Sequence, residues 1–409
     1  MQREELAAWL RLTLSPGVGN TTGRKLLAAF GLPQAIFGQT EAALAQVVDT
    51  KLARGLLREP PTLPALLEAT WQWQYASGTA DESATQVSTS PEHQPRRSIV
   101  TLGDAHYPEA LLQMEDPPLV LYLLGRGSLG PGQGLDGFAQ SRSIALVGSR
   151  NPTAQGADNA YAFGHAMAAA GLTVVSGMAV GVDGKAHEGA LDGASPNALA
   201  TIAVVGTGLD RVYPRRHLAL AHRITQQGLI VSEYPIGTPP LAANFPKRNR
   251  LIAALSQGTL VVEAALLSGS LITAKLAADM GREVFAIPGS IHSGMSRGCH
   301  ALIRQGAKLV ETAQDILEEL HLPAPTMAIS RNTAVLEPNE EQADELQDDT
   351  ANPESSLLTA LGFDPVSLDA LQARCGLPTS RLLAQLMELE LLGQVARLPG
   401  GLFQRVGQA

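Results

Sequence analysis

Between residues 98 and 322 the sequence alternates short apolar runs, rich in β-branched residues, with Ala- and Leu-rich stretches of helical character. Strands made of consecutive apolar residues are typical of a parallel sheet that is buried on both faces. Strand and helix in regular alternation predict a doubly wound α/β fold with a mainly parallel sheet. The predicted strands are 144–147, 173–175, 202–205, 229–231, 260–262 and 284–287, and the predicted helices are 157–170, 185–191, 217–227, 248–255 and 271–280.

Composition divides the rest of the 409-residue chain into smaller parts. Residues 1–75 have the apolar spacing of short helices, and 76–97 are rich in Ser, Thr, Gln and Pro, which predicts a linker. Residues 323–352 contain Pro and then many acidic groups, which predicts a second, disordered linker. We therefore expect a helical domain (1–75), an α/β domain (98–322) and a compact C-terminal domain (353–409), in agreement with about 150 residues per domain.

The net charge of −9 comes mostly from one segment. Residues 331–352 hold seven acidic groups and one arginine, and therefore contribute −6, whereas residues 97–325 carry 17 basic and 18 acidic groups. The central part of the chain is thus nearly neutral. An anionic ligand is compatible with it, although the overall charge alone argues against one.

The sequence also bears on the cell compartment. It has no run of about 18 apolar residues, and its first residues lack the basic and apolar regions of a secretory signal. Cys299 and Cys375 lie far apart in the sequence and predict neither a disulfide framework nor a zinc site. We therefore expect a cytoplasmic protein without a membrane span.

Small residues follow the predicted strands. In an open α/β sheet these positions crowd the crevice outside the carboxyl ends of the strands, where ligands bind. Glycines let backbone N–H groups approach an anion closely, helix N-termini add partial positive charge, and Arg150 offers a bidentate phosphate contact. Alternatively, these residues only form turns. They are Gly148, Ser149 and Arg150, Ser176 and Gly177, Gly206 and Gly208, and Ser232.

Several ligand-binding motifs are absent. The segment 148–153 has one glycine where the dinucleotide fingerprint G-x-G-x-x-G needs three, and no G-x-x-x-x-G-K-[ST] loop occurs. No pair of histidines has metal-ligand spacing beside suitable carboxylates. We therefore expect no nicotinamide cofactor, no nucleotide hydrolysis of the P-loop kind and no metal.

A basic run opens the predicted helix that begins near residue 248. Lys247, Arg248 and Arg250 lie beside Phe245 and Asn249, a combination suited to phosphates and unpaired bases. Cations at a helix N-terminus oppose the macrodipole, which a bound anion would explain. Successive helical positions turn through about 100°, so we expect only one or two of the three cations to meet phosphate.

Two questions about this region stay open. The alternative for the basic run is a solvated helix start with Phe245 in the core. Another basic group follows the third predicted strand and consists of Arg211, Arg215 and Arg216. These arginines either extend the basic surface formed by the run at 247–250 or are merely exposed.

These residues together resemble the DNA-processing protein A family (DprA, also called Smf). The densest resemblance covers residues 98–311. One departure is His300, where the family usually has Asn after Gly298. The matching motifs are Gly148-Ser149-Arg150, Ser176-Gly177-Met178-Ala179-Val180-Gly181-Val182-Asp183 with Ala186-His187, Gly206-Thr207-Gly208-Leu209-Asp210, Tyr213-Pro214, Ser232-Glu233-Tyr234-Pro235, Asn244-Phe245-Pro246-Lys247-Arg248-Asn249-Arg250-Leu251-Ile252, Ser268-Gly269-Ser270-Leu271, Gly281-Arg282 and Pro288-Gly289.

The resemblance implies an extended Rossmann-like domain in a non-catalytic, homodimeric protein of natural transformation. Such a protein binds single-stranded DNA, displaces single-strand-binding protein and hands the strand to the RecA recombinase. The resemblance assigns the strand-binding pocket to residues 148–150 and 245–250. Together with the crevice residues, the candidate nucleic-acid-binding set is Gly148, Ser149, Arg150, Ser176, Gly177, Gly206, Gly208, Ser232, Phe245, Lys247, Arg248, Asn249, Arg250, Ser268, Gly269 and Ser270.

The two ends resemble accessory domains. Residues 14–27 are similar to one helix-hairpin-helix element, whose glycines could offer amides to a phosphate, and equally to part of a structural SAM-like bundle. Residues 353–409 have a winged-helix pattern with four basic and five acidic groups. A DNA-reading helix is expected to be basic, so the pattern favours protein contact or autoregulation over duplex readout.

An enzymatic alternative is a nucleotide-cleaving hydrolase of the lysine-decarboxylase-like type, which shares the sheet and the crevice. That type requires a P-G-G-x-G-T-x-x-E loop, and the comparable segment 258–263 lacks the leading Pro-Gly-Gly. Asp183 and Glu263 are the candidate catalytic carboxylates. No nucleophile and base accompany them in the sequence.

Overall fold

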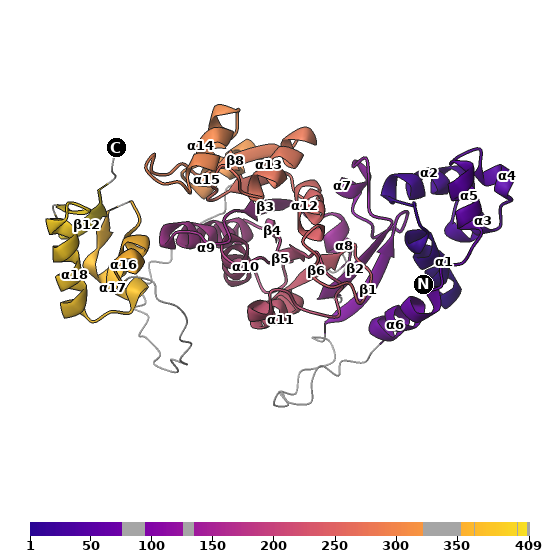
Figure 1. Ribbon diagram of the computed structural model, residues 1–409, viewed down its shortest axis with the longest axis horizontal. Coiled ribbons are helices and arrows are strands. Elements are labelled where there is room, and N and C mark those ends of the chain that lie inside the picture. The colour runs from indigo at the N-terminus through magenta and orange to yellow at the C-terminus, as the bar shows by residue number, and fades with distance from the viewer. Residues whose placement is uncertain (76–94, 126–134, 322–352, 364, 399, 407–409) are drawn as a thin grey trace.

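The computed structural model describes residues 1–75, 95–125, 135–321, 353–363, 365–398 and 400–406 (Figure 1). Its centre is a nine-stranded sheet with the order β1-β2-β6-β5-β4-β3-β7-β8-β9. In this sheet order, the seven strands β6-β5-β4-β3-β7-β8-β9 are parallel to one another, whereas β2 is antiparallel to both β1 and β6. The strands are β1 (Arg96–Thr101), β2 (Val120–Gly125), β3 (Ser143–Val147), β4 (Thr173–Ser176), β5 (Thr201–Val204), β6 (Gly228–Ser232), β7 (Gly258–Val261), β8 (Glu283–Ala286) and β9 (Lys308–Leu309).

The predicted doubly wound, mainly parallel sheet is confirmed. The six predicted strands correspond to β3 through β8, and the structure adds β1, β2 and β9. Two of these additions have weak sequence signals, since β1 begins with two arginines and β9 is two exposed residues long. The predicted linkers lie outside the described residues, except for 95–97, where β1 already begins at Arg96.

Alternate residues of each central strand face opposite layers of helices, as the period of two requires. In β3, Ile144 and Leu146 pack toward α9 and α10, whereas Ala145 and Val147 pack toward α12 and α13. None of the described helices has the length and apolar character needed to cross a membrane. The helices of this domain are α7 (Glu109–Leu112), α8 (Leu135–Ala139), α9 (Ala154–Ala169), α10 (Val182–Gly193), α11 (Leu218–Gln227), α12 (Asn244–Ala254), α13 (Ser270–Asp279), α14 (Arg297–Arg304) and α15 (Ala313–Glu319).

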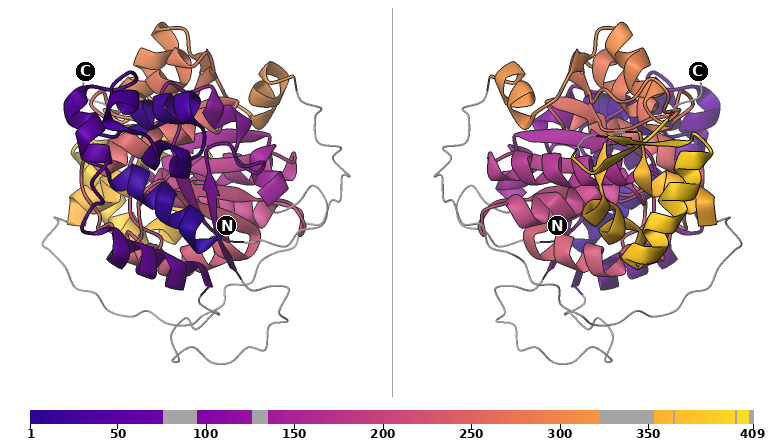
Figure 2. Two further views of the ribbon diagram at one scale, coloured as in Figure 1. Left: turned by 90° about the vertical axis from the view of Figure 1, so that its right-hand side faces the viewer. Right: turned by 90° about the vertical axis from the view of Figure 1, so that its left-hand side faces the viewer.

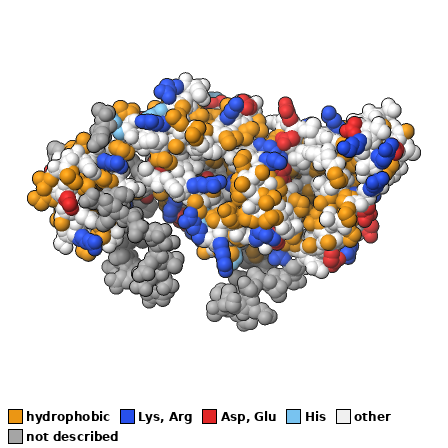
Figure 3. All heavy atoms as spheres, viewed as in Figure 1, with side chains coloured by type: hydrophobic (Ala, Val, Ile, Leu, Met, Phe, Trp, Pro, Cys, Tyr) orange, Lys and Arg blue, Asp and Glu red, His pale blue; other side chains and the backbone are white. Residues whose placement is uncertain are grey.

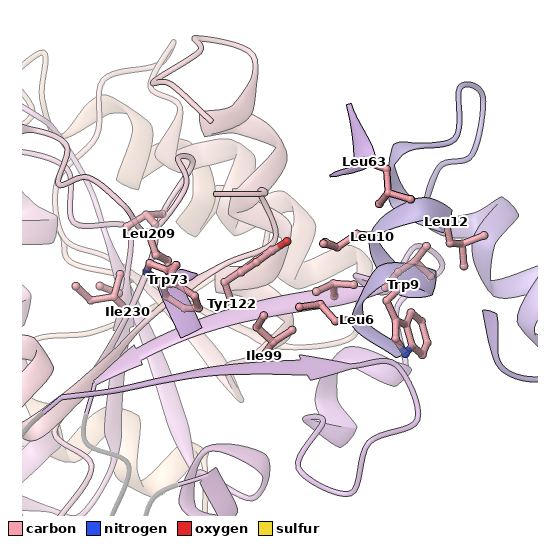
Figure 4. Close-up of a cluster of buried hydrophobic side chains, with 14 of the residues drawn as sticks. Leu6, Trp9, Leu10, Leu12, Leu63, Trp73, Ile99, Tyr122, Leu209 and Ile230 are labelled. Carbon is pink, nitrogen blue, oxygen red and sulfur yellow. The ribbon is translucent and has the colours of Figure 1, made fainter. Parts of the chain in front are cut away.

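The N-terminal helices share a core with the antiparallel edge of the sheet (Figure 4). Trp73 meets Tyr122 of β2 edge-on, with ring centroids 6.0 Å apart. At the predicted hairpin, a Cβ added to Gly23 would lie 2.3 Å from Leu119, so α2 packs closely against the segment before β2. The helices are α1 (Arg3–Leu14), α2 (Asn20–Phe30), α3 (Pro33–Phe37), α4 (Glu41–Leu44), α5 (Thr50–Leu56) and α6 (Leu63–Tyr75).

The C-terminal residues form a separate small core with the predicted winged-helix arrangement. It lies at the opposite end of the molecule from α1–α6 (Figures 1 and 2). An ion pair between Arg374 Nη2 and Asp158 Oδ2, 3.2 Å apart, joins it to α9. Its elements are α16 (Pro353–Leu361), β10 (Val366–Ser367), α17 (Leu368–Cys375), α18 (Thr379–Leu391), β11 (Val395–Leu398) and β12 (Leu402–Arg405), with strand order β10-β12-β11.

Candidate nucleic-acid interface

A crevice of about 700 Å³ opens beyond the carboxyl ends of β3 and β7. The chain leaves β3 toward β4 on one side and later returns to β7 on the other, so the loops after these strands diverge. Such a switch point is where open α/β sheets bind ligands. The crevice is lined by residues of these two loops, of α12 and of the first turn of α13, among them Gly148, Ser149, Arg150, Phe245, Arg248, Asn249, Ser268, Gly269, Ser270 and Ile272.

One face of α12 forms a wall of the crevice. Phe245, Arg248, Asn249 and Ile252 line it, at the spacing i, i+3, i+4 and i+7 that places side chains on one helical face. Lys247 is exposed but does not line the crevice. Lys247 and Arg248 therefore point in different directions, as the turn of about 100° between successive helical positions requires.

Aromatic and cationic side chains meet at the mouth of the crevice. The Phe245 and Tyr213 rings lie 5.5 Å apart, and the Arg150 guanidinium carbon lies 6.0 Å from the centre of the Phe245 ring. Tyr213 is 47% exposed and Phe245 is half-buried, so Phe245 is not the core residue that the alternative reading required. Arg150 is exposed and makes no ion pair within the described parts of the chain. Its guanidinium is thus available to a ligand.

Arg248 forms the floor of the crevice and is buried. Its Nη1 donates to the Val204 carbonyl at 2.9 Å, and a Cβ added to Gly177 would lie 1.6 Å from that nitrogen. The glycine therefore provides the space that the guanidinium fills. Burial lowers the pKa of Arg248 and raises the pKa of the buried Asp183, while the charge of each opposes the shift of the other. The floor therefore holds a buried arginine together with a buried carboxylate, because Asp183 also lines the crevice.

Four helices begin at or near the crevice, and two of these N-termini are already occupied. Glu263 accepts bonds from the backbone and hydroxyl of Thr153 at the start of α9, both at 2.8 Å. Asp183, in the first turn of α10, accepts from the Ala179 amide at 3.2 Å. By contrast, α12 and α13 begin without a carboxylate or a side-chain bond from the N-cap residue. The first amides of α13 are nevertheless bonded within the chain, those of Ser270 and Leu271 to the hydroxyl and carbonyl of Ser268. The start of α12 is therefore the N-terminus whose partial charge is available to an anion.

Asp183 and Glu263 were also the carboxylates considered for a hydrolase. Burial raises the pKa of each. Both accept hydrogen bonds from backbone amides of their own chain. Their observed contacts hold loops and helix ends in place.

The predicted ring of small residues is only partly at the crevice. The last residues of β4 and β6 are serines, Ser176 and Ser232, whose buried hydroxyls donate to the Leu146 and Thr207 carbonyls. The Ser149 amide is also committed, to the Glu263 carbonyl at 2.8 Å. Gly177 lines a smaller hollow beside the crevice, and the members that pack beneath the surface are Ser176, Gly206, Gly208 and Ser232.

Arg250 corrects the prediction for the basic run. It lies outside the crevice, with its side chain 13% exposed, and its Nε is 3.0 Å from Asp116 Oδ2. Its Nη2 pairs with Glu233, which also accepts from the Asn20 side chain of α2 at 3.3 Å. Arg250 thus ties α12 to the N-terminal helices and does not face the crevice.

We expect Arg250→Ala to lower the free energy of unfolding by about 2 kcal/mol, the cost of leaving a buried polar partner unsatisfied. Lys247→Ala is the matched control, since Lys247 is an exposed cation on the same helix. Thermal melts of both variants measure the difference. Equal melting temperatures for the two variants would contradict the structural role of Arg250.

The sequence-based candidate set omits several residues at the crevice and beside it. Among them, Tyr213 and Ile272 line the crevice, and Arg216 lines a smaller hollow next to it. The sequence signals for the first and third are the Tyr213-Pro214 motif and the basic group that contains Arg216. No periodic pattern singles out Ile272. His300 places Nε2 3.0 Å from the Gly289 carbonyl and so holds the loop after β8.

Comparison with known proteins identifies relatives of this chain. A family model described as DNA recombination-mediator protein A matches residues 98–321, and one described as the DprA winged helix domain matches residues 341–401. Protein Smf of Escherichia coli (strain K12) is 41% identical over 309 residues, covering 75% of this chain and 77% of that protein. DNA processing protein DprA of Streptococcus pneumoniae is 43% identical over 230 residues, or 56% of this chain and 76% of that protein. The X-ray structure of DprA from the same species matches 78% of this chain and 98% of its own, with 32% identity and a TM-score of 0.60.

Proposed function

Because this chain belongs to the DNA recombination-mediator protein A family, we propose that the crevice between α12 and α13 binds single-stranded DNA. The observation that carries the proposal is the contact between the exposed Tyr213 ring and the half-buried Phe245 ring, with an unpaired Arg150 beside it and the uncapped N-terminus of α12 nearby. Aromatic platforms in a positive groove are the general means of binding single strands without sequence preference.

The parts of the site have separate tasks in this proposal. Arg150 and the first turn of α12 hold phosphates. The buried Arg248 adds positive charge at the crevice, which the Asp183 carboxylate partly offsets. Phe245 and Tyr213 stack on bases, which an intact duplex keeps covered. Asn249, Ser268 and Ser270 complete the polar lining. Preference for single strands therefore comes from stacking, and most of the affinity from phosphate contacts.

Titration of a labelled oligothymidylate and of a duplex of the same length, over a salt series, tests the proposal. We expect tighter binding of the single strand, with a salt slope of about −0.7 for each phosphate contact. Equal affinity for the two forms would contradict a stacking site. Catalysis is not part of the proposal, because the carboxylates considered for hydrolysis already hold backbone amides of this chain.

The resemblance extends the proposal to partners. We infer that a homodimer of this protein displaces single-strand-binding protein and hands the strand to the RecA recombinase in the cytoplasm. Filament formation by RecA on strands coated with single-strand-binding protein measures that transfer. A protein that binds single strands but leaves the filament-formation rate unchanged would lack the transfer activity.

The winged-helix domain fits contact with a protein better than duplex readout. Its third helix, α18, exposes Leu383, Met387 and Leu391 along one side, together with Glu388 and Glu390. A helix that reads the major groove presents basic and polar groups to bases and phosphates. An exposed apolar stripe with acidic neighbours therefore supports a protein partner.

Removal of residues 325–409 is expected to leave single-strand affinity within a few-fold of that of the full chain, because the described residues that line the crevice lie between 147 and 295. Loss of the acidic segment 331–352 would raise the affinity for DNA if that segment competes with DNA for the basic side chains at the crevice. The same titration, run on the truncated and full-length proteins, measures the change. A large loss of affinity would mean that the winged helix contacts DNA.

Phe245→Ala is expected to weaken single-strand binding by about 1–3 kcal/mol and to leave the salt slope unchanged, since stacking releases no counterions. The control is Tyr75→Ala, which removes another exposed aromatic ring from α6, away from the crevice. Melting temperatures of both variants check folding. Normal affinity in a folded Phe245→Ala protein would exclude the stacking role.

A further inference from the structure

A second hollow, of about 190 Å³, adjoins the crevice. Arg150, Tyr213, Phe245 and Arg248 line both cavities, so the aromatic pair and its arginine stand between them. The second hollow differs from the first in its far wall. That wall is made by the loop that follows β4 and by Arg216, from the short 3-10 helix η2 (Arg215–His217).

The charges around the second hollow have one sign. Three arginines line it, Arg150, Arg216 and Arg248, and no carboxylate is present among its described lining residues. Arg216 is exposed and makes no ion pair in the described part of the structure, whereas the neighbouring Arg211 pairs with Asp210. A concave site with this composition attracts an anion.

The backbone wall of the hollow is held in one conformation. Met178 has φ of 56°, in the left-handed region that non-glycine residues seldom adopt, and its carbonyl is 3.0 Å from His217 Nδ1. The next amide, that of Ala179, is bonded to Asp183. The hollow is therefore formed before any ligand arrives, which lowers the entropic cost of binding.

We propose that the second hollow holds the phosphate of the next nucleotide of the bound strand, with Arg216 as its contact. The strand then passes from the α12–α13 crevice, across Phe245 and Tyr213, to η2. Figure 3 shows Lys and Arg side chains over the middle of the face viewed, with Asp and Glu more frequent toward the N-terminal helices. This path rests on the proposed single-strand binding and adds its direction across the sheet.

Arg215 offers a matched control within the same turn. It is exposed and unpaired among the described residues, like Arg216, but it does not line the hollow. We expect Arg216→Ala to reduce the magnitude of the salt slope by about 0.7 with long oligothymidylates, and Arg215→Ala to leave it unchanged. With the shortest oligonucleotides that bind, Arg216→Ala should have the same affinity as the parent protein, because these strands end within the first cavity. Arg216→Lys should keep the slope.

The outcomes separate this inference from the proposed function. Equal effects of Arg215→Ala and Arg216→Ala would overturn the path, since binding would then follow net charge. An effect of Arg150→Ala without any effect of Arg216→Ala would also overturn it, while leaving the crevice as the binding site. If neither Arg150→Ala nor Arg216→Ala changed binding in folded proteins, the proposed function and the path would both be wrong.

Discussion

An Arg150→Ala variant is expected to bind single-stranded DNA about 10- to 150-fold more weakly, a loss of about 1.5–3 kcal/mol. Arg150 lines both cavities and stands over the Phe245 ring. Its side chain is exposed to solvent, and among the described residues no carboxylate pairs with it. A charge-assisted bond to phosphate is the strongest single contact that this geometry offers. Fluorescence anisotropy of a labelled oligothymidylate, at several salt concentrations, measures both the affinity and the slope.

Arg223→Ala is the control for loss of one positive charge. Arg223 is an exposed arginine on α11, where it pairs with Asp192, and it lines neither cavity. We expect this variant to bind with unchanged affinity. Unchanged affinity in folded Arg150→Ala would remove Arg150 from the site, and equal losses in the two variants would show that only net charge matters.

An Arg248→Met variant is expected to lose about 3 kcal/mol of unfolding free energy at neutral pH, the lower end of the cost of leaving a buried charge without a nearby opposite charge. The buried Asp183 would lose the cation that opposes the rise of its pKa, and the Val204 carbonyl would lose its donor. Methionine fills much of the volume above Gly177, so the loss reports mainly the charge. Chemical denaturation measures it.

Asp183→Asn in the Arg248→Met background is expected to restore most of that loss, because the uncompensated charge is then gone. The pH dependence has a definite sign. The folded-state pKa of Asp183 is raised, so its contribution to stability is present below the unfolded pKa and is lost as pH rises through the folded pKa. Arg248→Met should therefore become less stable more steeply than the parent chain as pH rises from acid toward neutral. Failure of Asp183→Asn to recover stability would assign the cost to packing instead.

The central sheet could be predicted because its signals are local. Whether a segment such as 144–147 or 202–205 forms a buried strand depends on its own consecutive apolar residues and on the helical stretches around it. The crevice at the strand ends follows from the same reasoning, because carboxyl ends of parallel strands share one edge. The edge strands β1 and β9 could not be identified in this way, since arginines or exposed residues make up much of them.

Local sequence patterns therefore predict the sheet, its winding and the loops that reach the crevice, but not the role of each arginine. Arg150, Arg248 and Arg250 are chemically identical, yet one is free, one is buried over Gly177 and one is paired with Asp116 and Glu233. The environment of each arginine depends on groups that are distant in the chain and that only the packing of β4, β6 and α12 brings together. Tyr213 became part of the site for the same reason, since its ring reaches Phe245 only across the folded crevice. Burial and pairing of charges are properties of the assembled structure, because the electrostatic environment of a side chain is set by neighbours in space.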